Sequence, residues 1–306
     1  MLASLLRLII FGVLTASSAW FVLFWRIGHH DWAIGGVVAV VLTYAGIMAL
    51  EFAINARVNR RDLAPPATFA QRAEAWWGEV RSGIVVFCWR QPFRSRRWDD
   101  FVPESNIQGQ RGVVLVHGFV CNRGLWNRWL PRLRERGIAH IAVNLEPVFG
   151  SIEDYAPVIE DAVQRIERAT GLPPVIVAHS MGGLAVRHWW CEVDVQRVHR
   201  VVTIGTPHRG AWLARFALSP NGRQMRLGQE WSGALAQRQT PAFVQRLICF
   251  YGHCDNVVFP ASSATVPGAD NRHLEAVAHL RMADRPEPLA EVLRLCQPAV
   301  NSTVYQ

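Results

Sequence analysis

The chain has 306 residues, of which 50% are hydrophobic and 13 are Trp, so it can bury the core of one large domain and still supply further elements. Its 32 basic residues are all Arg and outnumber the 24 acidic ones, which gives a formal net charge of +8. Nucleic-acid binding is excluded as the reason for this charge, because the Arg residues gather beside an apolar segment and no recognition motif accompanies them.

Two long apolar stretches open the chain, Leu8–Trp25 and Trp32–Leu50, and neither contains a charged residue. Each has about the length that a helix needs to cross roughly 30 Å of hydrocarbon. The polar connection Arg26–Asp31 is short, so we predict that residues 1–55 form a transmembrane helical hairpin. The alternative is a cleaved signal peptide with its cleavage site at Ser17–Ala19, but the apolar run continues past that point.

Arginines set the predicted orientation of this hairpin. Arg57, Arg60 and Arg61 directly follow the second stretch, whereas the connection between the stretches holds a single Arg. By the positive-inside rule, both ends of the hairpin face the cytoplasm. We therefore predict a multi-pass protein of a bacterial inner membrane, with its remaining residues on the cytoplasmic side and an Arg-rich edge drawn to anionic lipid. Six cysteines without a C-x-x-C pair favour free thiols in a reducing compartment.

Residues 56–82 are predicted to form a linker and a juxtamembrane helix. Ala64–Ala67 contains adjacent prolines that break any helix, and Thr68–Val80 then places apolar residues at helical spacing. The next run, Gly83–Trp89, is rich in β-branched and aromatic residues and is typical of a strand. We take it as the start of a domain that covers residues 83–300.

Within this domain, strand-like runs alternate with helix-like segments. Arg111–Val116, Val198–Gly205 and Leu247–Gly252 are predicted to be strands, and Ser151–Ala169 is predicted to be a helix that opens with a capping-box-like pattern. Strands that alternate with helices favour the α/β class, in which a mostly parallel sheet is covered by helices on both faces.

A short loop after the strand at Val116 is predicted to supply part of an oxyanion hole. In His117-Gly118-Phe119, the backbone N–H of Phe119 would act together with that of Met181, the residue after a candidate nucleophile. Gly118 lets the backbone approach the developing negative charge. His117 is expected to orient the loop by hydrogen bonding rather than to transfer a proton in the reaction.

The candidate nucleophile is Ser180. It stands in the segment Ala178-His179-Ser180-Met181-Gly182, after an apolar strand-like run and before a helix-like stretch. Small residues two positions before and after a Ser permit the tight turn called a nucleophile elbow, which lifts the hydroxyl above the edge of the sheet. The alternative is an ordinary serine at a helix N-cap.

An acid and a base are expected later in the chain. Asp255 follows a late strand, where an orienting carboxylate belongs, and His279 lies further on after a short apolar run. We predict that His279 takes the proton of Ser180 and that Asp255 holds the imidazole in the required tautomer. The alternatives near the right places are Asp270 for the acid and His253 and His273 for the base.

Residues 207–245 break the alternation with several Gly and Pro residues and interspersed aromatic side chains. We predict that they form a lid or a wall of an acyl pocket, the alternative being a packed surface excursion. Trp126, which follows the oxyanion loop, is predicted to line the substrate pocket, although aromatic residues are more often part of a core. No metal or cofactor is expected, because the sequence contains no compact cluster of metal ligands.

Three segments resemble a known family. Val114–Phe119, Ala178–Gly183 and Thr203–Gly210 are similar to bacterial triacylglycerol lipases and esterases of the α/β-hydrolase superfamily, and also to lipase-like deacylases that act on glycosyl-phosphatidylinositol. The resemblance covers residues from about 110 to 296, and the chain order Ser, Asp, His is that of the superfamily. It implies an α/β-hydrolase fold and hydrolysis of carboxyl esters through an acyl-enzyme.

The sequence therefore predicts a membrane-anchored serine hydrolase that acts on a lipid-like or other apolar acyl ester. One alternative keeps the same three residues but makes the protein an acyltransferase or a thioesterase. Another is a non-catalytic membrane-interaction protein built on a hydrolase fold, against which the complete set of catalytic candidates argues.

Overall fold

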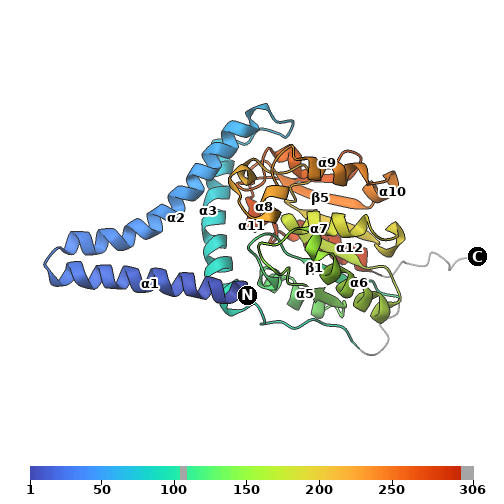
Figure 1. Ribbon diagram of the computed structural model, residues 1–306, viewed down its shortest axis with the longest axis horizontal. Helices are drawn as coiled ribbons and strands as arrows, with labels where there is room; N and C mark the ends of the chain where they lie inside the picture. Colours follow the sequence, from blue (N-terminus) through green and yellow to red (C-terminus); the bar gives the residue numbers. More distant parts are fainter. Residues whose placement is uncertain (104–108, 298–306) are drawn as a thin grey trace, which may run out of the picture.

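The computed structural model of the chain describes residues 1–103 and 109–297. A long helical hairpin projects from a rounded α/β domain, and one further helix lies between the two (Figure 1). The N-terminal helices are α1 (Leu2–Arg26), α2 (His30–Val58), α3 (Phe69–Val85) and α4 (Gln91–Phe93). The strands are β1 (Val113–Val116), β2 (His140–Ala142), β3 (Val175–His179), β4 (Arg200–Ile204), β5 (Leu247–Gly252) and β6 (Asp270–Leu274). The domain helices are α5 (Leu130–Arg134), α6 (Ala156–Thr170), α7 (Met181–Trp190), α8 (Pro220–Gln224), α9 (Glu230–Gln237), α10 (Pro241–Val244), α11 (His279–Met282) and α12 (Pro286–Cys296).

The six strands found among the described residues belong to one sheet, in the order β2-β1-β3-β4-β5-β6, and every neighbouring pair is parallel. In a parallel sheet the carboxyl ends of the strands lie at one edge, so the loops that follow them converge there. The predicted parallel sheet and the strands expected near residues 111–116, 198–205 and 247–252 are thereby confirmed.

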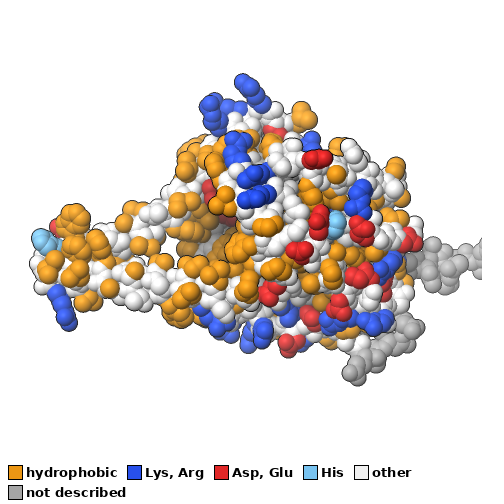
Figure 2. All heavy atoms as spheres, viewed as in Figure 1, with side chains coloured by type: hydrophobic (Ala, Val, Ile, Leu, Met, Phe, Trp, Pro, Cys, Tyr) orange, Lys and Arg blue, Asp and Glu red, His pale blue; other side chains and the backbone are white. Residues whose placement is uncertain are grey.

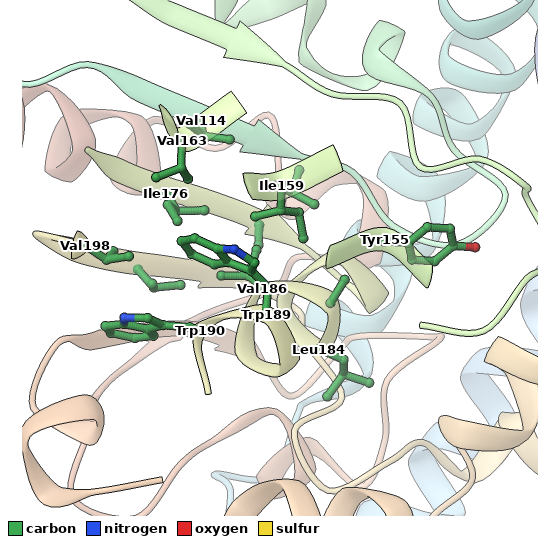
Figure 3. Close-up of a cluster of buried hydrophobic side chains, with 14 of the residues drawn as sticks. Val114, Tyr155, Ile159, Val163, Ile176, Leu184, Val186, Trp189, Trp190 and Val198 are labelled. Carbon is green, nitrogen blue, oxygen red and sulfur yellow. The ribbon is translucent and has the colours of Figure 1, made fainter. Parts of the chain in front are cut away.

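The central strands β1, β3, β4 and β5 carry few polar residues and bury both faces of the sheet, because successive side chains point to opposite sides. The edge strand β6 is polar and partly exposed. On one side, strand residues such as Val114 and Ile176 pack against α6 and α7, and Trp189 and Trp190 of α7 fill much of this core (Figure 3). On the other side, their neighbours in the strands pack against Trp129 and the apolar stripe of α12. The helices therefore fix the sheet from both faces and hold its carboxyl edge in place.

The prediction of a strand at Gly83–Trp89 is wrong. Helix α3 starts with a capping box, in which Thr68 accepts from the backbone of Gln71 and the Gln71 side chain accepts from Thr68, and it runs through this segment into a π-helical turn at Val86–Arg90. Short runs of β-branched residues fit a buried helix as well as a strand, so periodicity alone does not separate the two. Here Val86 enters the core, while Ile84 and Val85 are exposed.

Helices α1 and α2 form the hairpin, and both have the length and apolar composition of membrane spans. The 25 residues of α1 extend roughly 37 Å at 1.5 Å per residue. Unlike the core helix of a globular protein, both helices leave nearly all apolar side chains of these spans outside the protein interior. These side chains cover both arms of the hairpin (Figure 2). Both ends of the hairpin meet the domain: Leu2 and Leu6 of α1 pack against Val148, and Asn55 of α2 donates from Nδ2 to the backbone carbonyl of Asp255 at 2.7 Å.

Candidate active site

Ser180 occupies a strained turn between β3 and α7. Its φ of 55° and ψ of −131° are unusual for a residue with a Cβ, and its backbone N–H donates to the carbonyl of Ile204 at 2.9 Å. A Cβ on Gly182 would lie 2.4 Å from the carbonyl oxygen of His117, so only glycine fits there. This is the geometry of the predicted elbow, and it places the Ser180 hydroxyl at the carboxyl edge of the sheet.

The loop after β1 passes close to Ser180. A Cβ on Gly118 would lie 2.7 Å from Ser180 Cβ and 3.3 Å from Ser180 Oγ. Among the described residues, the backbone N–H groups of Phe119 and Met181 have no acceptor in the protein, and that of Met181 lies at the N-terminal end of α7. A developing oxyanion near Ser180 would meet these two donors and the positive end of the helix dipole.

His117 braces this loop. Its Nδ1 donates to the carbonyl of Gly118 at 2.9 Å, and its Nε2 accepts from the N–H of Leu145 at 3.0 Å. Burial lowers the pKa of His117 to about 4, so the ring is neutral and makes both bonds at neutral pH. These contacts agree with the predicted orienting role.

Asp255 and His279 are in contact. His279 Nδ1 donates to Asp255 Oδ2 at 2.9 Å, and Asp255 Oδ1 accepts from the N–H groups of Val257 and Val258 at 2.9 and 2.8 Å. Hydrogen bonds within its own loop therefore hold the Asp255 carboxylate in the position from which it accepts from His279. Burial alone would lower the pKa of His279, but the charge and hydrogen bond of Asp255, together with Glu79 and Glu51, outweigh it and raise the pKa above its usual value.

Ser180 and His279 line the same cavity, which has a volume of about 420 Å³. The end of β4 passes close to the acid and the base, because a Cβ on Gly205 would lie 3.1 Å from both Asp255 Oδ2 and His279 Nδ1. No hydrogen bond joins the Ser180 hydroxyl to His279 within the described part of the chain. Catalytic hydrogen bonds are often long without substrate and tighten when it binds.

Residues 113–246 match the model of the Alpha/beta hydrolase family. The domain has the α/β-hydrolase fold, and the matched residues make up less than half of the chain. The match starts at β1 and includes the elbow, and it ends just before the strand that precedes Asp255. A search of curated proteins finds no significant match to the chain.

Solved structures of lipases resemble the hydrolase domain in fold. The mature form of the Bacillus licheniformis lipase BlEst2 has 17% identity and a TM-score of 0.54, over 63% of this chain and 95% of that one. Aspergillus fumigatus lipase B has 18% identity and a TM-score of 0.55, over 65% of this chain and 56% of that one. The chain thus spans about half the length of the Aspergillus lipase, and 53% of the BlEst2 chain that retains its propeptide.

The other candidates for acid and base lie outside the cavity of the hydrolase domain. Asp270 is exposed and pairs with Arg272. His253 and His273 meet edge to face with ring centroids 4.6 Å apart, and His253 Nδ1 donates to the carbonyl of Pro65 at 3.0 Å. The structure therefore brings Asp255, and not Asp270, to a histidine at the carboxyl edge of the sheet.

Apolar side chains form most of the cavity wall. Residues 207–245 supply many of them, among them Leu213, Phe216 and Met225, and the N-terminal helices contribute Met48 and Phe87. Trp126 is not part of the wall: it is fully buried and packs edge-on against Trp129 at 5.4 Å. Its predicted role in substrate binding is thereby corrected, since its ring belongs to the core on the far side of the sheet.

Some residues beside the site were not expected from the sequence. His179 is buried, donates from Nε2 to the carbonyl of His279 at 3.1 Å, and lies with its ring 4.6 Å from that of His279. Burial lowers the pKa of His179 to about 3, so it stays neutral and does not compete as a base.

Glu51 and Glu79 also line the cavity. Among the described residues, no three His, Cys, Asp or Glu side chains are grouped so as to hold a metal ion.

Proposed function

We propose that this protein is a membrane-anchored serine hydrolase that cleaves carboxyl esters with apolar acyl groups. The observation that carries the proposal is the Asp255–His279 hydrogen bond of 2.9 Å in the cavity to which Ser180 also belongs. A nucleophile at a strained elbow, an imidazole in the required tautomer and a buried carboxylate are the three parts that acyl transfer needs.

In the proposed reaction, His279 Nε2 removes the proton from Ser180 Oγ as the oxygen attacks the ester carbonyl carbon. The carbonyl oxygen becomes an oxyanion and accepts hydrogen bonds from the N–H groups of Phe119 and Met181. The C–O bond to the alcohol then breaks, and the alcohol leaves with the proton from His279. Water, deprotonated by His279, attacks the acyl-enzyme and returns Ser180 and the free acid, while Asp255 stabilises the imidazolium in each half.

The substrate class follows from the wall of the cavity. Its lining is largely apolar, and one side consists of residues from the hairpin and the segment after it, Met48 of α2 and Phe87 of the π-helical turn. Hydrophobic side chains also surround the hollow at which hairpin and domain meet (Figure 2). A lipid-like ester held at the membrane surface matches this position, and the fold similarity to two lipases agrees with it.

The proposal is tested on the full chain purified in detergent. A fluorophosphonate probe should label the protein on the peptide that contains Ser180, as mapped by mass spectrometry. Among p-nitrophenyl esters, kcat/KM should rise with acyl length by up to about four-fold per methylene, because each buried CH₂ contributes roughly 0.8 kcal/mol. Label on a different serine, or specificity constants that do not change from acetate to octanoate, would contradict the proposal.

The orientation of the hairpin is a separate part of the proposal. Arg57, Arg60 and Arg61 lie where α2 ends, on the side of the domain, and favour a domain at the cytoplasmic face. Alkaline phosphatase fused to the C-terminus should therefore be inactive in a bacterial host, whereas a fusion to the loop Ile27–His29 at the tip should be active. The reverse pattern would invert the topology, and activity of a released C-terminal product would indicate signal cleavage instead.

A further inference from the structure

Three polar residues form one stripe on the last turns of α2. Glu51, Asn55 and Asn59 are spaced by four residues, so their side chains lie on the same face of the helix. Asn55 is only 1% exposed. A buried polar stripe at the end of an otherwise apolar helix needs hydrogen-bond partners, and here they come from the hydrolase domain.

The partners of this polar stripe are the loops that carry the acid and the base. Asn55 Nδ2 donates to the backbone carbonyl of Asp255 at 2.7 Å. Glu51 Oε2 accepts from Asn256 Nδ2 at 2.7 Å, and Asn256 Oδ1 accepts from the backbone N–H of His279 at 3.3 Å. Because a carboxylate only accepts, Glu51 fixes which way the Asn256 amide points, and so directs its oxygen to His279.

A second carboxyl group reaches the same place from α3. Glu79 is 1% exposed, and its two oxygens accept from the backbone N–H groups of Leu280 and Arg281 at 2.8 and 3.2 Å. These are the two residues that follow His279 in α11. The backbone N–H of His279, through Asn256, and the N–H groups of the next two residues are thus bonded to helices that precede the hydrolase domain.

We propose that Glu51, Asn55 and Glu79 are positioning residues of the active site, and that the membrane hairpin is consequently a structural part of the catalytic centre rather than an attachment to it. The inference rests on the proposed function, since it assigns a role to these groups in orienting Asp255 and His279. None of the three needs to touch substrate. Asn55 holds the backbone of Asp255, and Glu51 acts on the backbone of His279 through Asn256. Glu79 holds the backbone of the two residues that follow His279.

The same groups set the charge around the imidazole. The titratable groups that face His279 are Asp255 from the loop after β5, Glu51 from α2, Glu79 from α3 and His179 from β3. His179 is neutral, so three carboxyl groups act on the imidazolium. Burial raises the pKa of Glu79 to about 7, against the opposing effect of its two backbone hydrogen bonds and of His279. Its remaining titratable neighbour is Tyr44, also from α2.

The test of Glu79 is Glu79→Gln in the full chain, compared with Glu74→Gln in the same helix, where the side chain is 61% exposed and makes only a 3.9 Å contact with the Arg281 guanidinium. Glu79→Gln should lower kcat by about ten-fold or more at little change in KM, because a small displacement of a catalytic group is costly. It also removes the negative charge that Glu79 carries beside His279 near and above pH 7, where its carboxyl group ionises. The pKa of His279 should therefore fall, and the acid limb of the kcat/KM profile should move to lower pH.

Asn55→Ala tests the other helix and covers the case in which Glu79→Gln does not fold. It should lower kcat with KM and the acid limb unchanged, since it removes a hydrogen bond to Asp255 but no charge. Wild-type kcat and pH profile in both variants would overturn the inference, as would a loss of Tm alone. If Ser180→Ala keeps activity, the proposed function fails instead, which separates the two outcomes.

Discussion

Ser180→Ala should abolish turnover of every ester that the wild-type protein cleaves, and should also abolish fluorophosphonate labelling. The hydroxyl is the only group of the site that forms the acyl-enzyme, so its removal leaves substrate binding and the oxyanion donors without a nucleophile. A reduction of kcat by about 10⁴- to 10⁶-fold is expected, the range found when a serine nucleophile is deleted. Because the side chain becomes smaller inside an existing cavity, KM should change little.

A matched control is Ser232→Ala in α9, where the hydroxyl bonds to the carbonyl of Gln229 at 3.0 Å and takes no part in the cavity wall. This variant should hydrolyse esters at the wild-type rate. Single-turnover assays that detect released alcohol establish whether any residual activity of Ser180→Ala comes from the cavity that contains residue 180. A Ser180→Ala protein with half of the wild-type kcat would remove the assignment of the nucleophile.

His279→Ala should have nearly as large an effect, since a Ser hydroxyl is a weak nucleophile without its base. The loss of kcat should be comparable to that in Ser180→Ala, and the double variant should be no worse than either single one. Residues that act as a unit in one step are grossly non-additive in this way. Additive losses in the double variant would mean that the two side chains act in separate steps.

His273→Ala provides the control for this prediction. His273 meets His253 edge to face outside the cavity. The His273→Ala protein should therefore retain most of the activity. The measurement is kcat/KM on one ester for the three proteins at a single pH near 8. Retained activity in His279→Ala together with its loss in His273→Ala would transfer the base to the other histidine.

The fold could be predicted from the sequence because its elements are strongly patterned. Apolar runs such as Val113–Val116 and Val175–His179 lack the polar residues that an exposed strand carries, and helices separate them. Chain order then placed Asp255 and His279 at the same edge of the sheet as Ser180. The expected contact between Asp255 and His279 is present at 2.9 Å, while the roles of the three residues stay predictions.

Two errors arose where local pattern and tertiary context disagree. Gly83–Trp89 has strand-like composition, but the capping box at Thr68 starts a helix that continues through it. Trp126 follows the oxyanion loop, yet the short helical turn that carries it directs the ring into the core beside Trp129. Neither the helical conformation of Gly83–Trp89 nor the orientation of the Trp126 ring is encoded in a few neighbouring residues.

The polar stripe on α2 was missed although its signal is visible. Glu51, Asn55 and Asn59 recur at helical spacing in a segment whose one other polar residue up to Val58 is Arg57. Sequence position alone suggested a boundary between membrane and linker, where polar residues are ordinary. What they bind lies some two hundred residues away along the chain, as in the contact of Asn55 with Asp255, and such a distant pairing is not recoverable from a single sequence.

The contact of α2 with the Asp255 loop also bears on the order of events during synthesis. In the membrane-anchored protein proposed above, the hairpin would enter the bilayer before the hydrolase domain that follows it is complete, since domains generally fold in the order of synthesis. The last turns of α2 would then be in place when the hydrolase domain folds against them. A polypeptide whose hairpin failed to insert would lack this support, so the proposed esterase activity would arise only in molecules already in the membrane.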